Sequence, residues 1–391
     1  AGLSPPAPGA AVRTAAWVRD SGLPPVPPGS VMVEEVAARW IVELLGLPET
    51  SSVGLVTGGQ MANFTCLASA RDYVLREAGW DVEFNGLQGA PTVNVIVKAD
   101  GHTTVLRSLR YLGLGTSTAM PVECDAQARM NVDALEEVLA GVEGPTIICV
   151  EAAQINTGAF DDFGAVADLA DAHRERGHPT WVHVDGAIGL WALAARSMDS
   201  MTDGIDRLDS WSTDAHKLLN VGYDSGVAIV KHAAAHRSAM STTASYLVQS
   251  EGETRDPMDW NPEFSRRARG VPLYATLRSL GRSGVEDLVN RTHRLAKLFA
   301  ERLQASGQVE IINDVVFNQV LVRWLVGSDA DTFTDRLMEC VRDTGEAYFS
   351  GTTVAGERLM RISVSDWATD EADVERAVSV LLECAQRLGE S

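Results

Sequence analysis

One lysine and one aspartate stand where their side chains could act together on a carbonyl group and a pyridine ring. Asp185 ends the apolar run 181–184, which is typical of a buried strand, and Lys217 follows His216 just after a second such run at 208–211. Burial disfavours the charge of a lysine, which makes its amine a usable nucleophile toward a carbonyl. A carboxylate beside a pyridine nitrogen would keep that nitrogen protonated. The pair is the signature of a pyridoxal-phosphate (PLP) enzyme.

Each of the two residues also has an ordinary structural explanation. Taken alone, Lys217 would more often be a surface lysine, and Asp185 would more often cap the chain after a strand. The choice between the two interpretations depends on whether other segments supply the rest of a cofactor site.

Two other segments could supply the missing parts. Residues 54–63 pass from an apolar run through Thr57-Gly58-Gly59 into a helix expected at 61–78. Amides at a helix N-terminus bind anions and glycine permits close approach, so a phosphate could sit there, although a simple glycine turn is the alternative. His102 follows the strand expected at 92–97, at an edge that holds ligands in open α/β folds. A lone histidine there would otherwise be structural or solvent-facing.

Alternating strands and helices must position these groups. Residues 1–30 are rich in proline, alanine and glycine, which indicates an extended arm with at most one short helix near residues 12–19. A helix is expected at 31–45, followed by strands and helices in alternation, with further strands at 118–122, 146–150 and 226–230. This alternation is typical of a mainly parallel sheet covered by helices on both faces.

The last third of the chain has a different pattern. An irregular, charged stretch at 246–269 precedes a long helix or helix pair at 272–305. Beyond it the sequence predicts a small α+β unit, with strands at 308–312, 318–324, 347–350 and 359–364 and helices at 332–342 and 371–388. We divide the chain into an N-terminal arm and helix (1–50), a large domain (51–270) and a small C-terminal domain (271–391).

Composition and charge exclude several classes of protein. The 391 residues carry a net charge of −20, which argues against nucleic acid or an anionic membrane as a partner. The five cysteines are widely spaced without a CxxC pair, so we expect reduced thiols in a cytoplasmic protein and no metal site. The chain has no apolar run of about 18 residues and no signal-peptide pattern, so neither a membrane span nor a leader is expected.

The order of these features, and the sequences around them, resemble the group II PLP-dependent amino-acid decarboxylases. These are the relatives of aromatic-L-amino-acid and glutamate decarboxylases within the aspartate aminotransferase fold type I. The resemblance runs from about Val31 to the C-terminus. Its most specific segments are HVDGAIG (183–189), DSWSTDAHKLLN (209–220), NTGAFD (156–161), SRRARG (265–270) and RISVSDW (361–367).

The resemblance implies a fold, a cofactor and an assembly. The fold would be the α/β PLP-dependent transferase fold type I, with a mainly parallel seven-stranded sheet in the large domain and a small C-terminal α+β domain. The cofactor would be pyridoxal 5'-phosphate. The active site would form at the interface of a homodimer.

The resemblance also implies roles at the cofactor ring. Lys217 would form the internal aldimine, and Asp185 would pair with the pyridinium nitrogen. His102 would stack on one face of the ring and could assist proton transfer, while Ala187 would pack against the other face. Lys217, His102 and Asp185 are therefore the expected catalytic residues.

Further residues would hold the phosphate and the substrate. Gly59, Gln60 and His216 would bind the phosphate, and Asn156 or a neighbour would approach the ring oxygen or the phosphate. Arg361 lies where this fold type often places a carboxylate-binding arginine, with a structural salt bridge as the alternative. A tightly clamped carboxylate would oppose its own loss as CO2.

This chain departs from the family pattern at three places. The family often has serine at the position of Gln60, and its Gly-Thr-Thr loop is replaced by residues 153–155. Many members carry a tyrosine on a mobile loop that protonates the carbanion, but the matching loop, 248–259, contains none and Tyr246 lies only at its edge. In the family, loss of that tyrosine is associated with side chemistry such as oxidative deamination.

The expected function is decarboxylation of an L-amino acid to the amine and CO2. An aromatic substrate is favoured over an acidic one, because no cluster of extra cationic residues near the motifs would bind a second carboxylate. The alternatives are a PLP-dependent lyase, an aminotransferase or an aldehyde-forming oxidative decarboxylase on the same scaffold. A degenerate, non-catalytic PLP-fold protein is a further alternative of a different class.

Overall fold

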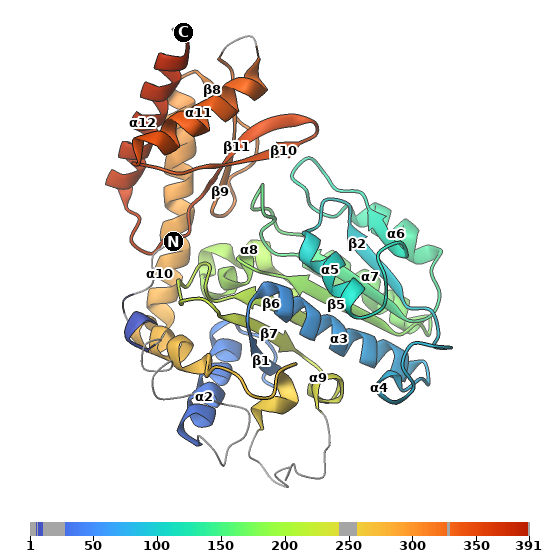
Figure 1. Cartoon of the computed structure of the whole chain (residues 1–391). Coiled ribbons are helices and arrows are strands. Elements are labelled where there is room, and N and C mark those ends of the chain that lie inside the picture. The colour runs from blue at the N-terminus through green and yellow to red at the C-terminus, as the bar shows by residue number, and fades with distance from the viewer. Residues whose placement is uncertain (1–4, 6, 11–27, 242–255, 327–328, 390–391) are drawn as a thin grey trace.

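The chain forms a large body and a small one, connected by a long helix (Figure 1). The computed structural model describes residues 5, 7–10, 28–241, 256–326 and 329–389. The connecting helix, α10 (Gly270–Ala305), runs from the large body into the small one. The helix expected near residues 12–19, and most of the loop expected at 248–259, lie outside the described residues.

A seven-stranded sheet forms the centre of the large body. Its strand order is β1-β7-β6-β5-β4-β2-β3, and only β7 runs antiparallel to its neighbours. The strands are β1 (Ser52–Val56), β2 (Asn94–Lys98), β3 (Ala119–Val122), β4 (Thr146–Glu151), β5 (Thr180–Asp185), β6 (Ser210–Asp214) and β7 (Gly226–Val230). All residues of β4, β5 and β6 are buried, as in a parallel sheet covered on both faces.

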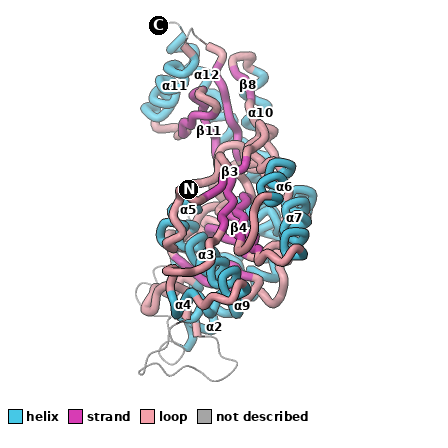
Figure 2. Tube along the Cα trace, turned by 90° about the vertical axis from the view of Figure 1, so that its right-hand side faces the viewer, coloured by secondary structure: helices cyan, strands magenta, loops and turns pink. Residues whose placement is uncertain are grey.

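Helices cover both faces of this sheet (Figure 2). One face carries α3 (Gly59–Glu77), α5 (Thr103–Tyr111) and α9 (Ala233–Met240), whose apolar side chains share one core with Trp181 of β5. The other face carries α2 (Pro28–Leu44), α6 (Val132–Ala140) and α7 (Phe163–Glu175), whose core includes Val182 and Val184. Successive β5 side chains therefore alternate between the two cores, as the pleat of a strand requires.

The small body is a four-stranded antiparallel sheet with two helices. Its strand order is β10-β11-β9-β8, and one core joins this sheet, its helices and the C-terminal part of α10. The elements are β8 (Val309–Ile311), β9 (Gln319–Trp324), α11 (Ala330–Thr344), β10 (Ser350–Val354), β11 (Glu357–Ser363) and α12 (Glu371–Gly389). These two sheets and their helices confirm the predicted α/β fold with a small α+β domain.

The structure corrects some of the predicted elements. The strand expected at 347–350 is wrong, because β10 begins at Ser350 and runs to Val354. Its register with β11 is set by a two-residue turn at Ala355 and Gly356, both of which have positive φ. The helices α4 (Val82–Asn85), α8 (Asp199–Thr202) and α9 were not predicted.

Helix α10 belongs to both bodies. Its apolar residues up to Val289 pack in the core of the large sheet, while those from Leu295 onward pack in the core of the small sheet. Residues of α2 pack in the large core as well. We therefore propose a domain boundary inside α10 rather than at its first residue. Among the helices in the described ranges, none combines the length and apolarity needed to cross a bilayer.

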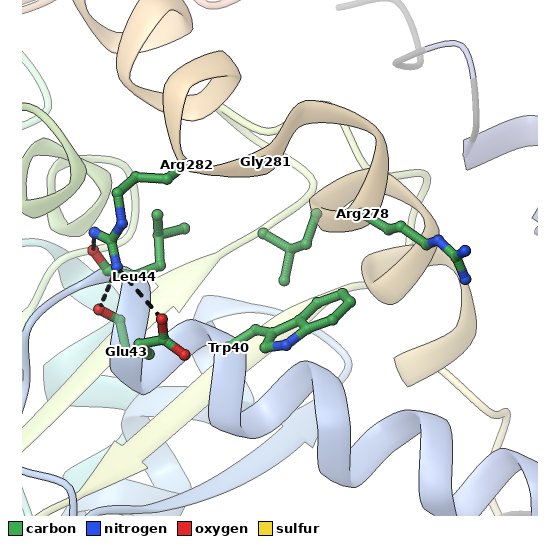
Figure 3. Close-up of a pocket in the computed structure, with 7 residues that line it drawn as sticks. Trp40, Glu43, Leu44, Arg278, Gly281 and Arg282 are labelled. Atoms are coloured by element: carbon green, nitrogen blue, oxygen red, sulfur yellow. Dashed lines mark hydrogen bonds and ion pairs between the residues drawn. The ribbon is translucent and has the colours of Figure 1, made fainter.

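A break in α10 allows it to hold the end of α2 (Figure 3). Gly281 has φ +62° and ψ −176°, outside the helical region, and glycine adopts this backbone without a Cβ penalty. The next residue, Arg282, donates to the backbone oxygens of Leu44 (3.0 Å) and Glu43 (2.9 Å). These carbonyls end α2 beside a cavity of about 280 Å³, and a cation there satisfies them and the helix dipole.

Replacing Arg282 with alanine should lower the free energy of unfolding by about 1 kcal/mol, because Leu44 O loses the side-chain donor and Glu43 O keeps only the backbone N–H of Gly46 at 3.3 Å. Urea denaturation monitored by circular dichroism measures this change. Arg278→Ala is the matched control, because Arg278 is exposed on the same helix and donates to the Tyr274 hydroxyl instead of a carbonyl of α2. Equal stabilities of the two variants would show that Arg282 does not cap α2.

Candidate active site

Four charged residues end four neighbouring strands of the large sheet. Lys98 ends β2, Glu151 ends β4, Asp185 ends β5 and Asp214 ends β6, and all four are at most 6% exposed. The carboxyl ends of parallel strands meet at one edge of a sheet, where open α/β folds bind ligands. This edge therefore holds four charged side chains, of which only Asp185 was predicted from the sequence as a site residue.

A cavity of about 210 Å³ opens between this edge and the small body. Its walls include four of the predicted residues from the large body and three residues from the small sheet. These are His102, Asp185, Ala187 and Lys217, with Gln319 of β9 and Arg361 and Ser363 of β11. The structure thus brings together the amine, the carboxylate and the imidazole expected at a cofactor ring.

The amine of Lys217 is held by a carboxylate that was not among the predicted residues. Lys217 Nζ lies 3.0 Å from Asp214 Oδ2, and His216 Nε2 lies 3.3 Å from Asp214 Oδ1. The backbone N–H of Gly59, at the start of α3, donates to the same Oδ1 at 2.5 Å. Burial lowers the pKa of His216, although Asp214 opposes this effect. Asp214 therefore occupies the helix N-terminus at which the sequence predicted a phosphate.

Three donors surround the carboxylate of Asp185. Asn63 Nδ2 donates to Oδ2 at 2.9 Å, and the Thr104 hydroxyl donates to the same oxygen at 3.3 Å. The backbone N–H of Ala187 donates to Oδ1 at 3.2 Å. The side chain is therefore fixed in one orientation at the wall of the cavity, as its expected role at the ring nitrogen requires.

His102 is positioned by both its backbone and its ring. It precedes α5, its ring Nδ1 lies 2.7 Å from Thr104 Oγ1, and its backbone N–H donates to Glu151 Oε1 at 2.7 Å. Burial raises the pKa of Glu151 to about 7, against the opposing charge of Lys98, whose Nζ lies 3.2 Å from Oε2. Glu151 and Lys98 were not predicted, although each visibly ends an apolar run in the sequence.

Four predicted cofactor residues do not line the cavity, namely Gly59 and His216, which contact Asp214, and Gln60 and Asn156. The amide of Gln60 donates to Thr104 O (3.1 Å) and Ser108 Oγ (2.8 Å), so it ties α3 to α5. The backbone N–H of Asn156 donates to Gln154 Oε1 at 2.6 Å, in a turn whose residue Ile155 reaches the cavity instead. Neither Gln60 nor Asn156 is among the residues that line the cavity.

The residues at the cavity fit pyridoxal phosphate at its ring end. Lys217 offers an amine for the aldehyde, Asp185 a fixed carboxylate for the ring nitrogen, and His102 and Ala187 side chains for the ring. At the other end, Gly59 and His216 both meet Asp214. Contacts of Gly59, His216, Gln60 and Asn156 with the cofactor remain predictions.

Comparison with known proteins shows the family of the chain. The family model "Pyridoxal-dependent decarboxylase conserved domain" matches residues 25–325. Tryptophan decarboxylase 1 of Oryza sativa subsp. japonica is 27% identical over 378 residues, which cover 90% of this chain and 72% of that protein. Acidic amino acid decarboxylase GADL1 of Homo sapiens is 28% identical over 287 residues, which cover 71% of this chain and only 53% of that protein.

Solved structures show the same fold. The crystal structure of Oryza sativa TDC with PLP and tryptamine superposes with a TM-score of 0.90 at 24% identity, covering 99% of this chain and 82% of that chain. Mouse CSAD superposes with a TM-score of 0.89 at 21% identity, covering 98% of this chain and 82% of that chain. Together with the cavity and the match over residues 25–325, these findings show that the chain belongs to the PLP-dependent (group II) amino-acid decarboxylase family, with pyridoxal phosphate as its cofactor.

Proposed function

We propose that the protein decarboxylates an L-amino acid, aromatic rather than acidic, to the amine and CO2. The observation that carries this proposal is the convergence of Lys217, Asp185 and His102 on one cavity of a decarboxylase-family scaffold. The proposal extends to a homodimer with the active site at the subunit interface, and to a cytoplasmic location, as the family resemblance implies.

Each residue has a distinct task in this reaction. Bound pyridoxal phosphate supplies the electron sink that stabilises the carbanion left by CO2. The Lys217 amine attaches the cofactor, and Asp185 holds a proton at the pyridine nitrogen. The His102 ring, fixed by Thr104, covers one face of the cofactor. Arg361 and Gln319 of the small body form part of the cavity wall opposite the sheet edge, where they would face the substrate.

Arg361 is available for the substrate carboxylate. Its guanidinium donates to Ser350 Oγ (3.2 Å) and Ile155 O (3.3 Å), and within the described ranges it pairs with no carboxylate. Burial lowers its pKa, as expected for a charge that awaits a partner. The structural salt bridge considered from the sequence is therefore not formed among the described residues.

The lining of the cavity favours an aromatic side chain over an acidic one. Arg361 is the single arginine among the lining residues, so once it binds the α-carboxylate no guanidinium remains for a second carboxylate. Ile155 and Ile188 add apolar surface for a ring. The relatives include both a tryptophan decarboxylase and an acidic amino acid decarboxylase, so family membership alone does not choose between the two substrate classes.

An aldehyde-forming reaction is the second candidate. It is favoured by the loop at 248–259, whose sequence lacks the tyrosine expected to return a proton to the carbanion. Residues 248–255 and Tyr246 lie outside the described residues. If Cα were not protonated, dissolved O2 would serve as the two-electron oxidant and be reduced to H2O2, and water would then release the aldehyde and ammonia.

The attachment of the cofactor can be tested at Lys217. Wild-type protein mixed with pyridoxal phosphate should turn yellow, because a Schiff base to a lysine absorbs visible light. Lys217→Ala should stay without this band and lose activity by about a thousandfold or more. Lys231→Ala is the control, since Lys231 Nζ donates to Arg207 O away from the cavity. After unbound cofactor is removed, a wild type without the Schiff-base band, or Lys217→Ala with it, would refute the role of Lys217.

The products distinguish decarboxylation from its rivals. With a panel of aromatic, acidic and aliphatic L-amino acids, we expect CO2 and amine in equal amounts, fastest with an aromatic substrate. Ammonia and aldehyde alongside CO2 would favour the aldehyde-forming reaction. The absence of CO2 from every amino acid would eliminate both, and a higher kcat/KM for an acidic substrate would overturn the proposed specificity.

Binding of the carboxylate can be tested with Arg361→Met. Loss of a charged hydrogen-bond donor should raise KM for every amino acid by about tenfold or more. Arg323→Met is the control, because Arg323 lies on the neighbouring strand β9 and pairs with Glu357. Steady-state kinetics give both constants. A loss confined to kcat would mean that Arg361 acts in the transition state rather than in binding.

A further inference from the structure

A buried histidine lies next to the cofactor site without reaching the cavity. His183 is two residues before Asp185 on β5, and its side chain is fully buried. Alternate residues of a strand point the same way, so Trp181, His183 and Asp185 all face α3. Asn63 of α3 lies opposite them and contacts both His183 and Asp185.

Four hydrogen bonds connect these residues in a row. The Trp181 indole Nε1 lies 2.8 Å from Ser210 Oγ, and that oxygen lies 2.9 Å from His183 Nδ1. His183 Nε2 lies 2.9 Å from Asn63 Oδ1, and Asn63 Nδ2 lies 2.9 Å from Asp185 Oδ2. Every member of the row is buried, so water does not compete for these groups.

The chemistry at the two ends fixes the direction of the whole row. An indole N–H can only donate, so the Ser210 oxygen accepts from Trp181, and its own hydrogen is free to donate to His183 Nδ1. A carboxylate can only accept, so Asn63 must present its NH2 to Asp185 and its oxygen to His183. The His183 proton is then on Nε2, where it donates to Asn63.

Two further observations agree with this direction. The Ser212 hydroxyl lies 2.6 Å from Asn63 Oδ1, a second donor that keeps the amide oxygen turned away from Asp185. Burial also lowers the pKa of His183 to about 4, against the opposing charge of Asp185, so the ring is neutral with a single N–H. A neutral ring can accept at Nδ1 and donate at Nε2 at once.

We propose that His183 is a positioning residue, which holds Asp185 toward the cofactor ring through Asn63. Without the N–H of His183, the oxygen of Asn63 keeps only the Ser212 hydroxyl as a donor, so the amide is held less firmly against Asp185. Asp185 would then lose an aligned donor on the side away from the cavity. This inference rests on the proposed function in one respect, namely that Asp185 pairs with the cofactor's ring nitrogen.

A double-mutant cycle with His183 and Asp185 tests the inference. Asp185→Asn is measured first, His183→Leu removes the hydrogen bonds, and His183→Gln restores an N–H near the position of Nε2. The readouts are the dissociation constant of pyridoxal phosphate, by absorbance titration, and the position of the visible band. We expect His183→Leu to weaken cofactor binding by about tenfold, and His183→Gln to recover most of the loss.

The cycle separates positioning from a general structural role. If His183 acts through Asp185, His183→Leu should add little to the defect of Asp185→Asn, because the two changes remove one function. Additive losses, or an unchanged dissociation constant and band in His183→Leu, would overturn the inference while leaving the proposed function intact. No effect of Asp185→Asn itself would overturn the expected role of Asp185, and the inference with it.

A milder variant covers the case in which His183→Leu does not fold. Ser210→Ala removes the donor to His183 Nδ1 and should weaken cofactor binding by about threefold. Ser69→Ala is the matched control, because the buried Ser69 hydroxyl donates to Thr65 O within α3 and lies outside the row. Equal dissociation constants for these two variants would contradict the proposed positioning role.

Discussion

The site depends on one constraint, which is that charged groups at the ends of fully buried strands must be paired by the protein itself. Asp185, Asp214, Glu151 and Lys98 end neighbouring strands at an edge from which water is largely excluded. Burying an unpaired charge is costly, so each has charged partners or hydrogen-bond donors at short range. The partners come from the loops and helices that follow the strands, and these same elements carry Lys217, His102 and Asn63. The same contacts therefore stabilise the buried charges at this edge and fix the positions of the site residues.

The pairing also divides the edge into two halves. Around Asp185 the partners are neutral donors, which fix the side chain and leave its charge for the cofactor ring. Around Asp214 the partners are Lys217, His216 and the N-terminus of α3, so this carboxylate is shared among the groups expected at the aldehyde and the phosphate. A cofactor that binds Lys217 and Gly59 would change their contacts with Asp214, because both residues contact this carboxylate.

The small body supplies the cavity wall that faces the edge of the large sheet. Arg361 and Gln319 reach the cavity from β11 and β9, whose own core is shared with the far end of α10. Because the near end of α10 packs in the large core, one helix fixes the position of both walls. The break at Gly281, with Arg282 on the end of α2, lets this helix follow both bodies. The position of this cavity wall is thus connected to packing well away from the cavity.

The sequence by itself determined the fold class, the reactive residue types and the strand ends that carry them, because burial and periodicity are local patterns. It predicted Lys217, Asp185, His102 and Ala187, which all line the cavity. It placed one strand wrongly, because the Ala355–Gly356 turn sets the register of β10, and it missed α9. It did not assign Asp214 to the start of α3, or join His183 to Asp185 through Asn63. Those contacts connect residues far apart in the chain, and only the strand order of the sheet and the packing of α3 against it decide which of them meet.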